Sequence, residues 1–535
     1  MQHLRNPCRR LAALALTAAL AAADERFLVQ GEGRLAELAV GREYGPNGKV
    51  LWSVPCALVE AAALAPNGNV FVTLPGGRLA EVAPRSQRWV WREAADPART
   101  LPPLAALPAV PVSERRPLRE ALEDFGDDIG LWRLVDDGPD AALLARARDI
   151  HWRAVTLDTH KDIRDSLALA PEDGSALALR DDPTRWGPNQ VDLPKMRSGG
   201  LDVAFYIVYV AQGPLSAEGF AAAKSQALAK FAAIERQAQS FPNEVVLART
   251  PDEVLAGVAA GRLVSCIGIE NGYAMGEDLA LLQEFHRRGA RYMSLTHNGH
   301  SQLGDANTPE EPLHGGLTEL GRRAIEELNR LGIMVDVSHS AKSTMLQAVA
   351  HSRAPVIASH SGVRALCDHP RNLDDEQLRA LAAKRGVLQC VAFDGYVVDA
   401  RPRSAAIAAA RAALGLPPEE RFRRVEPGSE DQEKLRALRE RVAEIEAQFP
   451  RATVKDLVDH VDHAVKVMGI DFVALSSDFD GGGGIQGWND ASETFEVTLE
   501  LVRRGYDEEA IGKLWSGNTL RLWREVEAAA AALGR

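Results

Sequence analysis

The chain has 535 residues and a formal net charge of −12 at pH 7. This length predicts more than one domain, and 46% hydrophobic with 25% charged residues is ordinary for a globular protein. An acidic chain without a basic block argues against nucleic acid or an anionic membrane surface as the main partner. Cysteine is sparse and no CxxC pair occurs, so neither a disulfide scaffold nor a thiolate zinc site is expected.

The N-terminus has the layout of an export signal. Three arginines, Arg5, Arg9 and Arg10, precede an apolar run over residues 11–22, and alanines at 21–23 offer a small-residue cleavage site. Such a run is typical of a secretory signal and too short to cross a membrane. We therefore expect residues 1–23 to be a signal peptide and the protein to be exported, periplasmic or secreted, and soluble without a membrane anchor.

Residues 24–95 predict a small accessory β unit. The pentapeptide GRLAE occurs at 33–37 and again at 77–81, and a tryptophan-containing strand follows each copy. The pattern is similar to two propeller blades, but two copies cannot close a propeller. A packing or docking role is expected for this unit. Residues 96–138, rich in proline and alanine, predict a linker and lead-in to a larger domain at 139–535.

In this larger domain, short apolar runs alternate with amphipathic helical segments such as 316–331, 342–351 and 454–468. Eight such repeats predict a (β/α)8 TIM-like barrel with insertions, and a doubly wound open sheet is the alternative. The charged stretch 401–450 predicts a helical insertion. The expected strands are 154–157, 202–210, 264–269, 292–295, 333–337, 355–358, 387–393 and 472–475.

Polar side chains that could bind metal follow several of these strands. Because the C-terminal ends of barrel strands meet at one rim, we expect these side chains to converge there. Nitrogen and oxygen ligands without sulfur suit zinc. If Glu270 is shared, each of two ions has three protein ligands and free positions for water or hydroxide, whose pKa the cations lower. The candidate ligands are His160, Asp162, Glu270, His339 and His360.

Three further residues at this rim predict catalytic or substrate-binding roles. Asp478 would shuttle protons, His297 would stabilise a developing oxyanion, and Arg371 would clamp a substrate carboxylate. Asp480 competes with Asp478 for the proton-shuttle role. Asp478 is favoured because it follows the last strand sooner.

Other histidines have simpler interpretations. His460 and His463 have the i, i+3 spacing of a metal pair, but they lie on an amphipathic helix, where a structural role is expected. His300, His314 and His369 are predicted loop residues that border the pocket or are solvated.

The barrel region, roughly residues 140–535, resembles the membrane (renal) dipeptidase family of dinuclear zinc peptidases. The motifs that carry the resemblance are QVDLPKMRSGGLDVAFYIVYV, SLTHN, GLTELGRRAIEELNRLGIMVDVSHS, ASHSGVRALCDHPRNLDDE and SSDFDG. Each motif alone is weak, but the combination is specific.

The resemblance implies a zinc-dependent dipeptidase that hydrolyses the peptide bond of dipeptides through a metal-bound hydroxide. Family members often tolerate a D-residue at the C-terminal side of the dipeptide. One implied zinc would be bound by His160, Asp162 and Glu270, and the other by Glu270, His339 and His360. The resemblance also implies that His297 and Arg371 contact the substrate and that Asp478 fills the role of the aspartate after the last strand.

The chain departs from the family pattern at three points. Asn271-Gly272 stands where the family usually has Gly-Gly, residues 24–95 lie outside the pattern, and the lipid anchor of mammalian members has no counterpart. Two alternatives stay open: another barrel amidohydrolase, such as a lactonase or deaminase, and a non-catalytic binding protein. The amidohydrolases commonly carry HxH on the first strand and often a bridging lysine, so HxD with Glu270 favours the dipeptidase. A homo-oligomer is compatible with the sequence.

Overall fold

The computed structural model describes residues 141–164, 183, 189–416 and 430–534, together with strands between residues 26 and 135. The expected signal peptide, residues 1–23, lies outside the described residues, so export stays a prediction. Among the helices in the described part of the chain, none has both the length and the apolar character needed to cross a bilayer.

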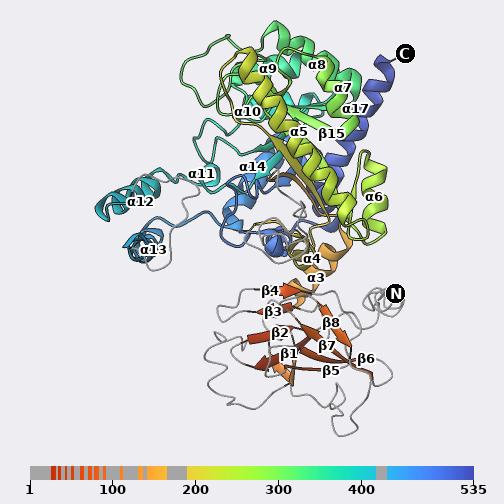
Figure 1. Ribbon diagram of the computed structural model, residues 1–535, viewed down its shortest axis with the longest axis vertical. Coiled ribbons are helices and arrows are strands. Elements are labelled where there is room, and N and C mark those ends of the chain that lie inside the picture. Colours follow the sequence, from red (N-terminus) through yellow and green to blue (C-terminus); the bar gives the residue numbers. More distant parts are fainter. Residues whose placement is uncertain are drawn as a thin grey trace.

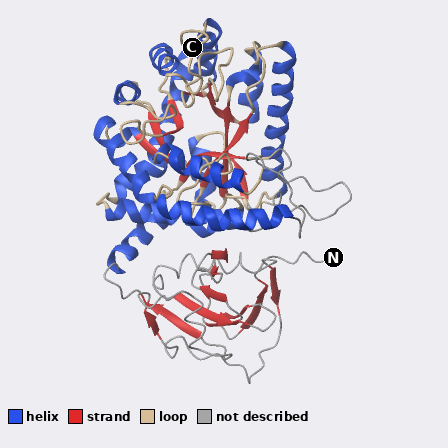
Figure 2. Ribbon diagram, turned by 90° about the vertical axis from the view of Figure 1, so that its left-hand side faces the viewer, coloured by secondary structure: helices blue, strands red, loops and turns tan. Residues whose placement is uncertain are grey.

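The larger domain is built on a barrel of eight parallel strands, which confirms the predicted (β/α)8 TIM-like fold. Figure 2 shows these strands enclosed by helices. A short additional strand, β13 (Val245–Leu247), pairs in parallel with the first residues of β14. In barrel order the eight strands are β11 (Leu157–Asp162), β12 (Val203–Tyr209), β14 (Leu263–Glu270), β15 (Ala290–Ser294), β16 (Met334–Asp336), β17 (Ile357–Ser361), β18 (Val387–Val391) and β19 (Val473–Ser476).

Each strand buries both faces, as is usual in a parallel sheet. In β12, Val203, Phe205 and Ile207 belong to one apolar cluster. The intervening Ala204 and Tyr206 belong to a second cluster, shared with the surrounding helices. This alternation follows from the two-residue period of a strand.

Two expected strands are displaced along the sequence. The first was expected at 154–157, but β11 begins at Leu157 and runs through the polar sequence DTHKD to Asp162. The sixth was expected at 355–358, but β17 extends to Ser361. Hydrogen bonds to neighbouring strands hold these polar segments extended, so His160 and His360 lie within strands rather than after them.

The barrel closes between its first and last strands by an irregular seam. β11 is joined to the loop that follows β19 by a single isolated bridge, between Lys161 and Phe479. Pairing is equally sparse between β16 and β17, which share the one pair Asp336–Ile357, whereas the remaining neighbouring strands are joined by longer registered pairing. Asp162 donates its backbone N–H to the Phe479 carbonyl at 2.9 Å. The buried Asp158 accepts hydrogen bonds from the backbone N–H and the hydroxyl of Ser477.

Helices cover the outside of the barrel, and the C-terminal helix α17 adds Trp523 and Val526 to the same apolar cluster as Phe205. Among the helices, α9 and α14 match the predicted segments 342–351 and 454–468. The helices are α3 (Ala141–Arg153), α4 (Leu193–Gly199), α5 (Ala217–Ser240), α6 (Pro251–Ala259), α7 (Ala280–Arg288), α8 (Glu319–Leu331), α9 (Lys342–His351), α10 (Asp375–Ala383), α11 (Asp394–Val397), α14 (Val454–Met468), α15 (Thr494–Arg503), α16 (Glu508–Gly512) and α17 (Asn518–Leu533).

The predicted charged insertion contains two further helices, α12 (Arg401–Ala413) and α13 (Glu430–Gln448). In Figure 1 they project from the barrel as a separate arm. The base of this arm is tied down by Arg403, which is buried, pairs with Asp394 of α11 and donates to the Pro450 carbonyl at 2.7 Å.

Before residue 136 the structure describes ten strands in two sheets. One sheet has the order β4-β3-β2-β1-β10-β9 and the other β5-β6-β7-β8. The predicted boundaries of the accessory unit and its blade-like repeats stay predictions. The strands are β1 (Arg26–Gly31), β2 (Arg34–Glu37), β3 (Arg42–Tyr44), β4 (Val50–Ser53), β5 (Ala61–Leu64), β6 (Val70–Leu74), β7 (Arg78–Ala83), β8 (Arg88–Trp91), β9 (Ala109–Pro111) and β10 (Leu131–Val135).

Candidate metal centre

Glu270, the last residue of β14, lies at the centre of the converging side chains and is buried. Its Oε1 atom is 3.0 Å from His339 Nε2 and 3.2 Å from His360 Nε2. Its Oε2 atom faces another neighbour, His160, with Nε2 at 3.6 Å. One carboxylate therefore faces two groups of ligands, which is the arrangement needed to bridge two cations.

These two groups have different origins. The histidine side consists of His339, after β16, and His360, in β17. The seam side consists of His160 and Asp162 in β11 and Asp478 after β19. There His160 Nε2 lies 3.8 Å from Asp162 Oδ2 and 3.9 Å from Asp478 Oδ1.

The protonation of the three imidazoles follows from their hydrogen bonds. On the histidine side, His339 Nδ1 lies 3.0 Å from the Asn298 side-chain oxygen, which can only accept. His360 Nδ1 lies 2.8 Å from the Ser359 hydroxyl, whose proton goes to Asp336.

On the seam side, His160 Nδ1 lies 3.0 Å from the Tyr292 hydroxyl, whose proton goes to the Thr159 carbonyl. All three imidazoles therefore donate from Nδ1. Each directs its Nε2 atom toward Glu270, as metal-ligating histidines do.

This arrangement requires a positive charge between the side chains. The Nε2 atoms of His339 and His360 are only 3.0 Å apart, and without protons their lone pairs face each other and Glu270. The Nε2 atom of His160 is buried without a hydrogen-bond partner. Unpaired buried polar atoms are costly, so the donor set fits divalent cations, and its nitrogen and oxygen chemistry suits zinc.

The electrostatics of these side chains point the same way. Burial disfavours a charged His160, but Glu270, Asp478 and Asp162 outweigh burial and raise its pKa to about 9. Burial, aided by the positive charge of Arg371, holds the pKa of His339 well below its ordinary value. The seam side thus attracts a positive charge and the histidine side offers neutral imidazoles.

Glu270 is held in its ionised form despite its burial. Burial alone would raise its pKa, but His160 and His297 hold the pKa well below the usual range. Burial, together with the charge of Glu270, raises the pKa of Asp162 to about 6. Burial, with Asp162 and Glu270 nearby, raises the pKa of Asp478 to about 8. The carboxyl groups of Asp162 and Asp478 therefore both have proton affinities within about one pH unit of neutrality, as an acid or base working near pH 7 requires.

Backbone strain gathers at this rim. Of the five non-glycine residues with positive φ in the described part of the chain, four are Asn271, His339, Asp478 and Asp480. Such conformations persist where the surroundings over-determine them, often at functional sites. Asn271 stands where the family usually has glycine, and it has φ 78°. Its side-chain amide donates to the Val210 carbonyl at 3.2 Å, and this hydrogen bond helps to stabilise the strained backbone.

His297 follows β15 and borders the histidine side. Its Nε2 atom lies 3.9 Å from Glu270 Oε1, and its ring packs 4.3 Å from that of His339 and 4.8 Å from that of Tyr209. At 17% side-chain exposure it is open enough to meet a substrate bound at the metal centre.

Arg371 reaches the same rim from the loop after β17. It is 2% exposed, and one of its terminal nitrogens donates to the His360 carbonyl at 3.0 Å. The other two guanidinium nitrogens, Nε and Nη1, are buried without hydrogen-bond partners. The guanidinium lies 5.2 Å from the Tyr396 ring centre. These unpaired donors would suit an incoming carboxylate.

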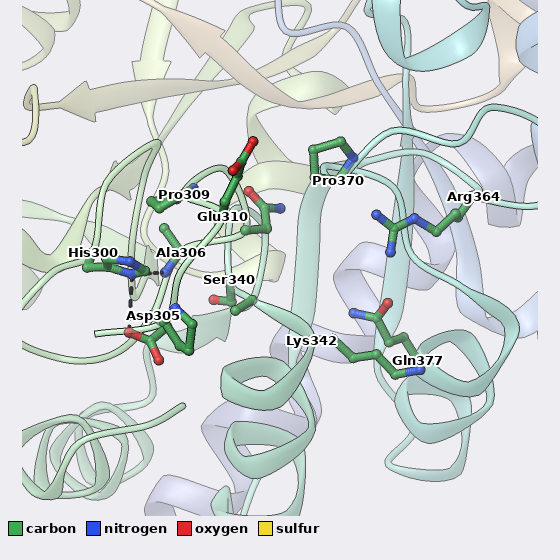
Figure 3. Close-up of a pocket in the computed structure, with 13 residues that line it drawn as sticks. His300, Asp305, Ala306, Pro309, Glu310, Ser340, Lys342, Arg364, Pro370 and Gln377 are labelled. Carbon is green, nitrogen blue, oxygen red and sulfur yellow. Dashed lines mark hydrogen bonds and ion pairs between the residues drawn. The ribbon is translucent and has the colours of Figure 1, made fainter. Parts of the chain in front are cut away.

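A cavity of about 170 Å³ lies between the loops after β15, β16 and β17. Its walls include Ser340, which follows His339 in the chain, and Pro370, which precedes Arg371. Figure 3 shows Glu310 and Arg364 on opposite sides of it. His300 lines it too, held by a 3.1 Å ion pair with Asp305, so this predicted loop histidine borders a pocket.

The two aspartates after β19 lie on different sides of β11. Asp478 faces His160, whereas Asp480 Oδ2 lies 3.4 Å from Lys161 Nζ on the other side of β11. His460 and His463 are not part of the centre. His460 Nδ1 accepts from the backbone N–H of Val363, and His463 pairs with Asp375 at 2.8 Å.

Sequence reasoning missed the residues that orient the histidines. Tyr292 lies within β15, Asn298 in the loop after it and Ser359 within β17, and nothing in the sequence assigned an orienting role to them. Tyr292 meets His160 across 132 positions. Only Ser359 had a signal, its place directly before His360. Tyr396 was also missed. It lies in the short helix α11, and only the tertiary fold brings that helix next to Arg371.

Comparisons with known proteins agree with this geometry. The model of the membrane dipeptidase family, peptidase family M19, matches residues 144–534. Dipeptidase tcpJ of Claviceps purpurea is 29% identical over 356 residues, which are 65% of this chain and 72% of that protein. Dipeptidase 3 of Rattus norvegicus is 28% identical over 345 residues, 63% of this chain and 59% of that protein.

Among solved structures, the probable dipeptidase PvdM of Pseudomonas aeruginosa is 31% identical with a TM-score of 0.61, covering 73% of this chain and 100% of that chain. A metallo peptidase from Rhodobacter sphaeroides, solved with a phosphinate mimic of the dipeptide L-Ala-D-Ala, is 24% identical with a TM-score of 0.54. It covers 70% of this chain and 99% of its own.

Proposed function

Because the chain belongs to the membrane dipeptidase family and is a metal-dependent dipeptidase, we propose that its active site holds two zinc ions bridged by Glu270. His160 and Asp162 would complete one site, and His339 and His360 the other. The observation that carries this proposal is the convergence of three histidine Nε2 atoms, from His160, His339 and His360, on the two oxygens of Glu270.

Two bound zinc ions would lower the pKa of a water molecule and polarise the peptide carbonyl. The chain's own residues do the rest. Asp478, buried beside the seam side, takes a proton from the attacking water and returns it to the leaving amine. His297 donates a hydrogen bond to the oxygen that becomes negatively charged.

The substrate we propose is a dipeptide with a free C-terminal carboxylate, including dipeptides with a D-residue at that position. Arg371 supports this proposal, because two of its nitrogens are buried without partners. The Rhodobacter relative bound to a mimic of L-Ala-D-Ala also supports it.

We also propose that the protein is exported after removal of residues 1–23. The support is the arginine-flanked apolar run at the N-terminus. N-terminal sequencing of the mature protein tests it, and an intact N-terminus on protein recovered from its natural source would contradict it.

A dipeptide panel with and without chelator tests the function most directly. We expect hydrolysis of L,L- and L,D-dipeptides, loss of activity in chelator, recovery on adding Zn²⁺, and about two zinc equivalents per chain by elemental analysis. Full activity in a metal-free preparation would contradict the mechanism. Hydrolysis of lactones but not dipeptides would favour the amidohydrolase alternative.

The carboxylate clamp has its own test. Arg371→Ala should raise KM for dipeptides by about 10–100-fold, since a charge-assisted hydrogen bond contributes roughly 1.5–3 kcal/mol. The C-terminally amidated dipeptides are the control, and their weaker hydrolysis should change little. An equal loss on both substrate sets would remove the clamp from the mechanism.

A further inference from the structure

An ion pair between a buried lysine and an aspartate at the surface crosses the barrel seam directly behind the seam side of the metal centre. Lys161 Nζ lies 3.4 Å from Asp480 Oδ2, with only 4% and 20% of the two side chains exposed. Lys161 also lies 4.9 Å from the ring centre of Tyr206. Neither residue points into the metal centre, and neither has a part in the chemistry described above.

Both residues of the pair are close in the sequence to side chains of the metal centre. Lys161 stands between His160 and Asp162, so it is attached to the backbone that carries both. Asp480 stands two residues after Asp478 in the loop that follows β19. The pair therefore joins the two segments whose side chains must meet on the seam side.

The backbone at this point has little regular pairing to hold it. One isolated bridge, between Lys161 and Phe479, joins β11 to the loop after β19, and Asp478 and Asp480 on either side of Phe479 both have positive φ, at 56° and 61°. Gly481 packs so tightly here that a Cβ would overlap carboxylate oxygens of both Asp478 and Asp162. A small shift of this loop would change the distance between those two carboxylates.

Asp480 also anchors the loop to a third segment. Its carboxylate accepts the backbone N–H groups of Gln190 and Val191 at 2.7 and 3.3 Å. In return, the Gln190 side chain accepts from the Asp480 N–H at 2.7 Å and donates to the Gly483 carbonyl at 2.9 Å. These bonds fix the Asp480 carboxylate, so it is a rigid counter-charge for Lys161.

We propose that Lys161 and Asp480 are positioning residues, whose ion pair across the barrel seam fixes the Asp478 carboxylate opposite Asp162. The inference rests on the proposed roles of Asp162 as a ligand and Asp478 as the proton shuttle. Misplacing a catalytic group by about 1 Å can cost on the order of 10²-fold in rate. The pair matters for turnover because it sets that distance.

The test is a double-mutant cycle with Lys161→Met, Asp480→Asn and the double variant. Each single change should lower kcat by about 10–100-fold while KM stays within about twofold. Each single change also leaves a partly buried charge without its partner, which destabilises the fold, and the double variant removes that penalty. Thermal stability should therefore recover in the double variant, whereas kcat should stay as low as in the single variants. Recovery of kcat together with stability would show a merely structural pair and overturn the proposal.

Lys195→Met is the matched control. Lys195 Nζ lies 3.5 Å from Asp490 Oδ2, with 5% and 7% of the side chains exposed, so this pair is more deeply buried than the seam pair but does not bridge the two ends of the barrel. The control should lose stability and keep kcat. An equal loss of kcat in Lys195→Met, or kcat within about twofold of the parent in both seam variants, would refute the positioning role. If Lys161→Met does not fold, the kcat of Asp480→Asn alone tests the positioning role.

Titration of the metal-free protein with Co²⁺, followed by visible absorption, gives a readout independent of turnover. Because Asp162 is held by the seam, Co²⁺ affinity should fall by about tenfold in the seam variants and stay unchanged in Lys195→Met. Unchanged affinity in the seam variants counts against the proposal. A parent protein without chelator-sensitive dipeptidase activity would instead refute the proposed function, and the Co²⁺ titration would still test the seam.

Discussion

The two sides of the metal centre are built differently. On the histidine side, His339 and His360 come from neighbouring strands, and their Nδ1 atoms meet Asn298 and Ser359 at 3.0 and 2.8 Å. On the seam side, His160 and Asp162 come from the first strand of the barrel and Asp478 from the loop after the last strand, and one bridge joins that loop to the first strand. A side with neutral imidazoles is suited to hold a cation, whereas a side with two raised carboxyl pKa values is suited to exchange protons.

Glu270 is the residue on which both sides depend, so its removal should have the largest effect. Glu270→Ala should abolish binding of both cations and lower turnover beyond the roughly 10⁴-fold that loss of one proton-transfer group costs. Elemental analysis after gel filtration measures the metal content. Retention of one full equivalent would mean that the two sides bind cations independently.

Asp478→Asn tests the seam side alone. We expect turnover to fall by about 10²–10⁴-fold while metal content stays at the parent level, because the amide cannot carry the proton. The matched control is Asp471→Asn, whose side chain is 57% exposed near the opposite end of β19 and pairs with Lys513. Full activity in Asp478→Asn would assign the proton transfer to another group.

The barrel was predictable from the sequence because its signals are local. Buried parallel strands read as apolar runs, and α9 and α14 show helical spacing, so fold and strand count followed directly. The first strand was displaced because β11 is polar, and its polar residues stay extended through contacts with β12 and Ser477. The polar residues at strand ends predicted which side chains converge, since one rim collects them all.

The details of the site were less predictable because they depend on long-range contacts. The sequence favoured Asp478 over Asp480 only by its distance from the strand, and it gave no sign that Asp480 pairs with Lys161. The hydrogen-bond partners of the histidines could not be predicted, because Tyr292 and Asn298 meet His160 and His339 only in the folded chain. A single sequence shows which groups a site contains but not what orients them.

Acidification should separate the two sides. In the metal-free protein the pKa of His160 is raised to about 9, so below pH 9 a cation on the seam side must displace its proton. Apparent affinity there should fall about tenfold per pH unit, or about 100-fold between pH 8 and 6. The pKa of His360 is held well below its ordinary value by burial, so the histidine side should keep its cation.

Equilibrium dialysis over a pH series, followed by elemental analysis, measures this difference. Below about pH 6 protonation of Asp162, whose pKa is raised to about 6, should steepen the loss further. Simultaneous release of both cations over the whole series would contradict the assignment of the raised pKa to the seam side.

The smallest expected effect concerns the orientation of one imidazole on the histidine side. Asn298→Ala removes the oxygen that accepts from His339 Nδ1, so the ring should lose its fixed tautomer and bind its cation about 10–100-fold more weakly. Competition with a coloured chelator measures each affinity. Thr308→Ala is the control, because the Thr308 hydroxyl lies 3.4 Å from the same Asn298 oxygen but takes no part in holding the ring. Equal weakening of both cations in Asn298→Ala would mean that the two sides respond as one unit, and that the bridge through Glu270 outweighs their separate construction.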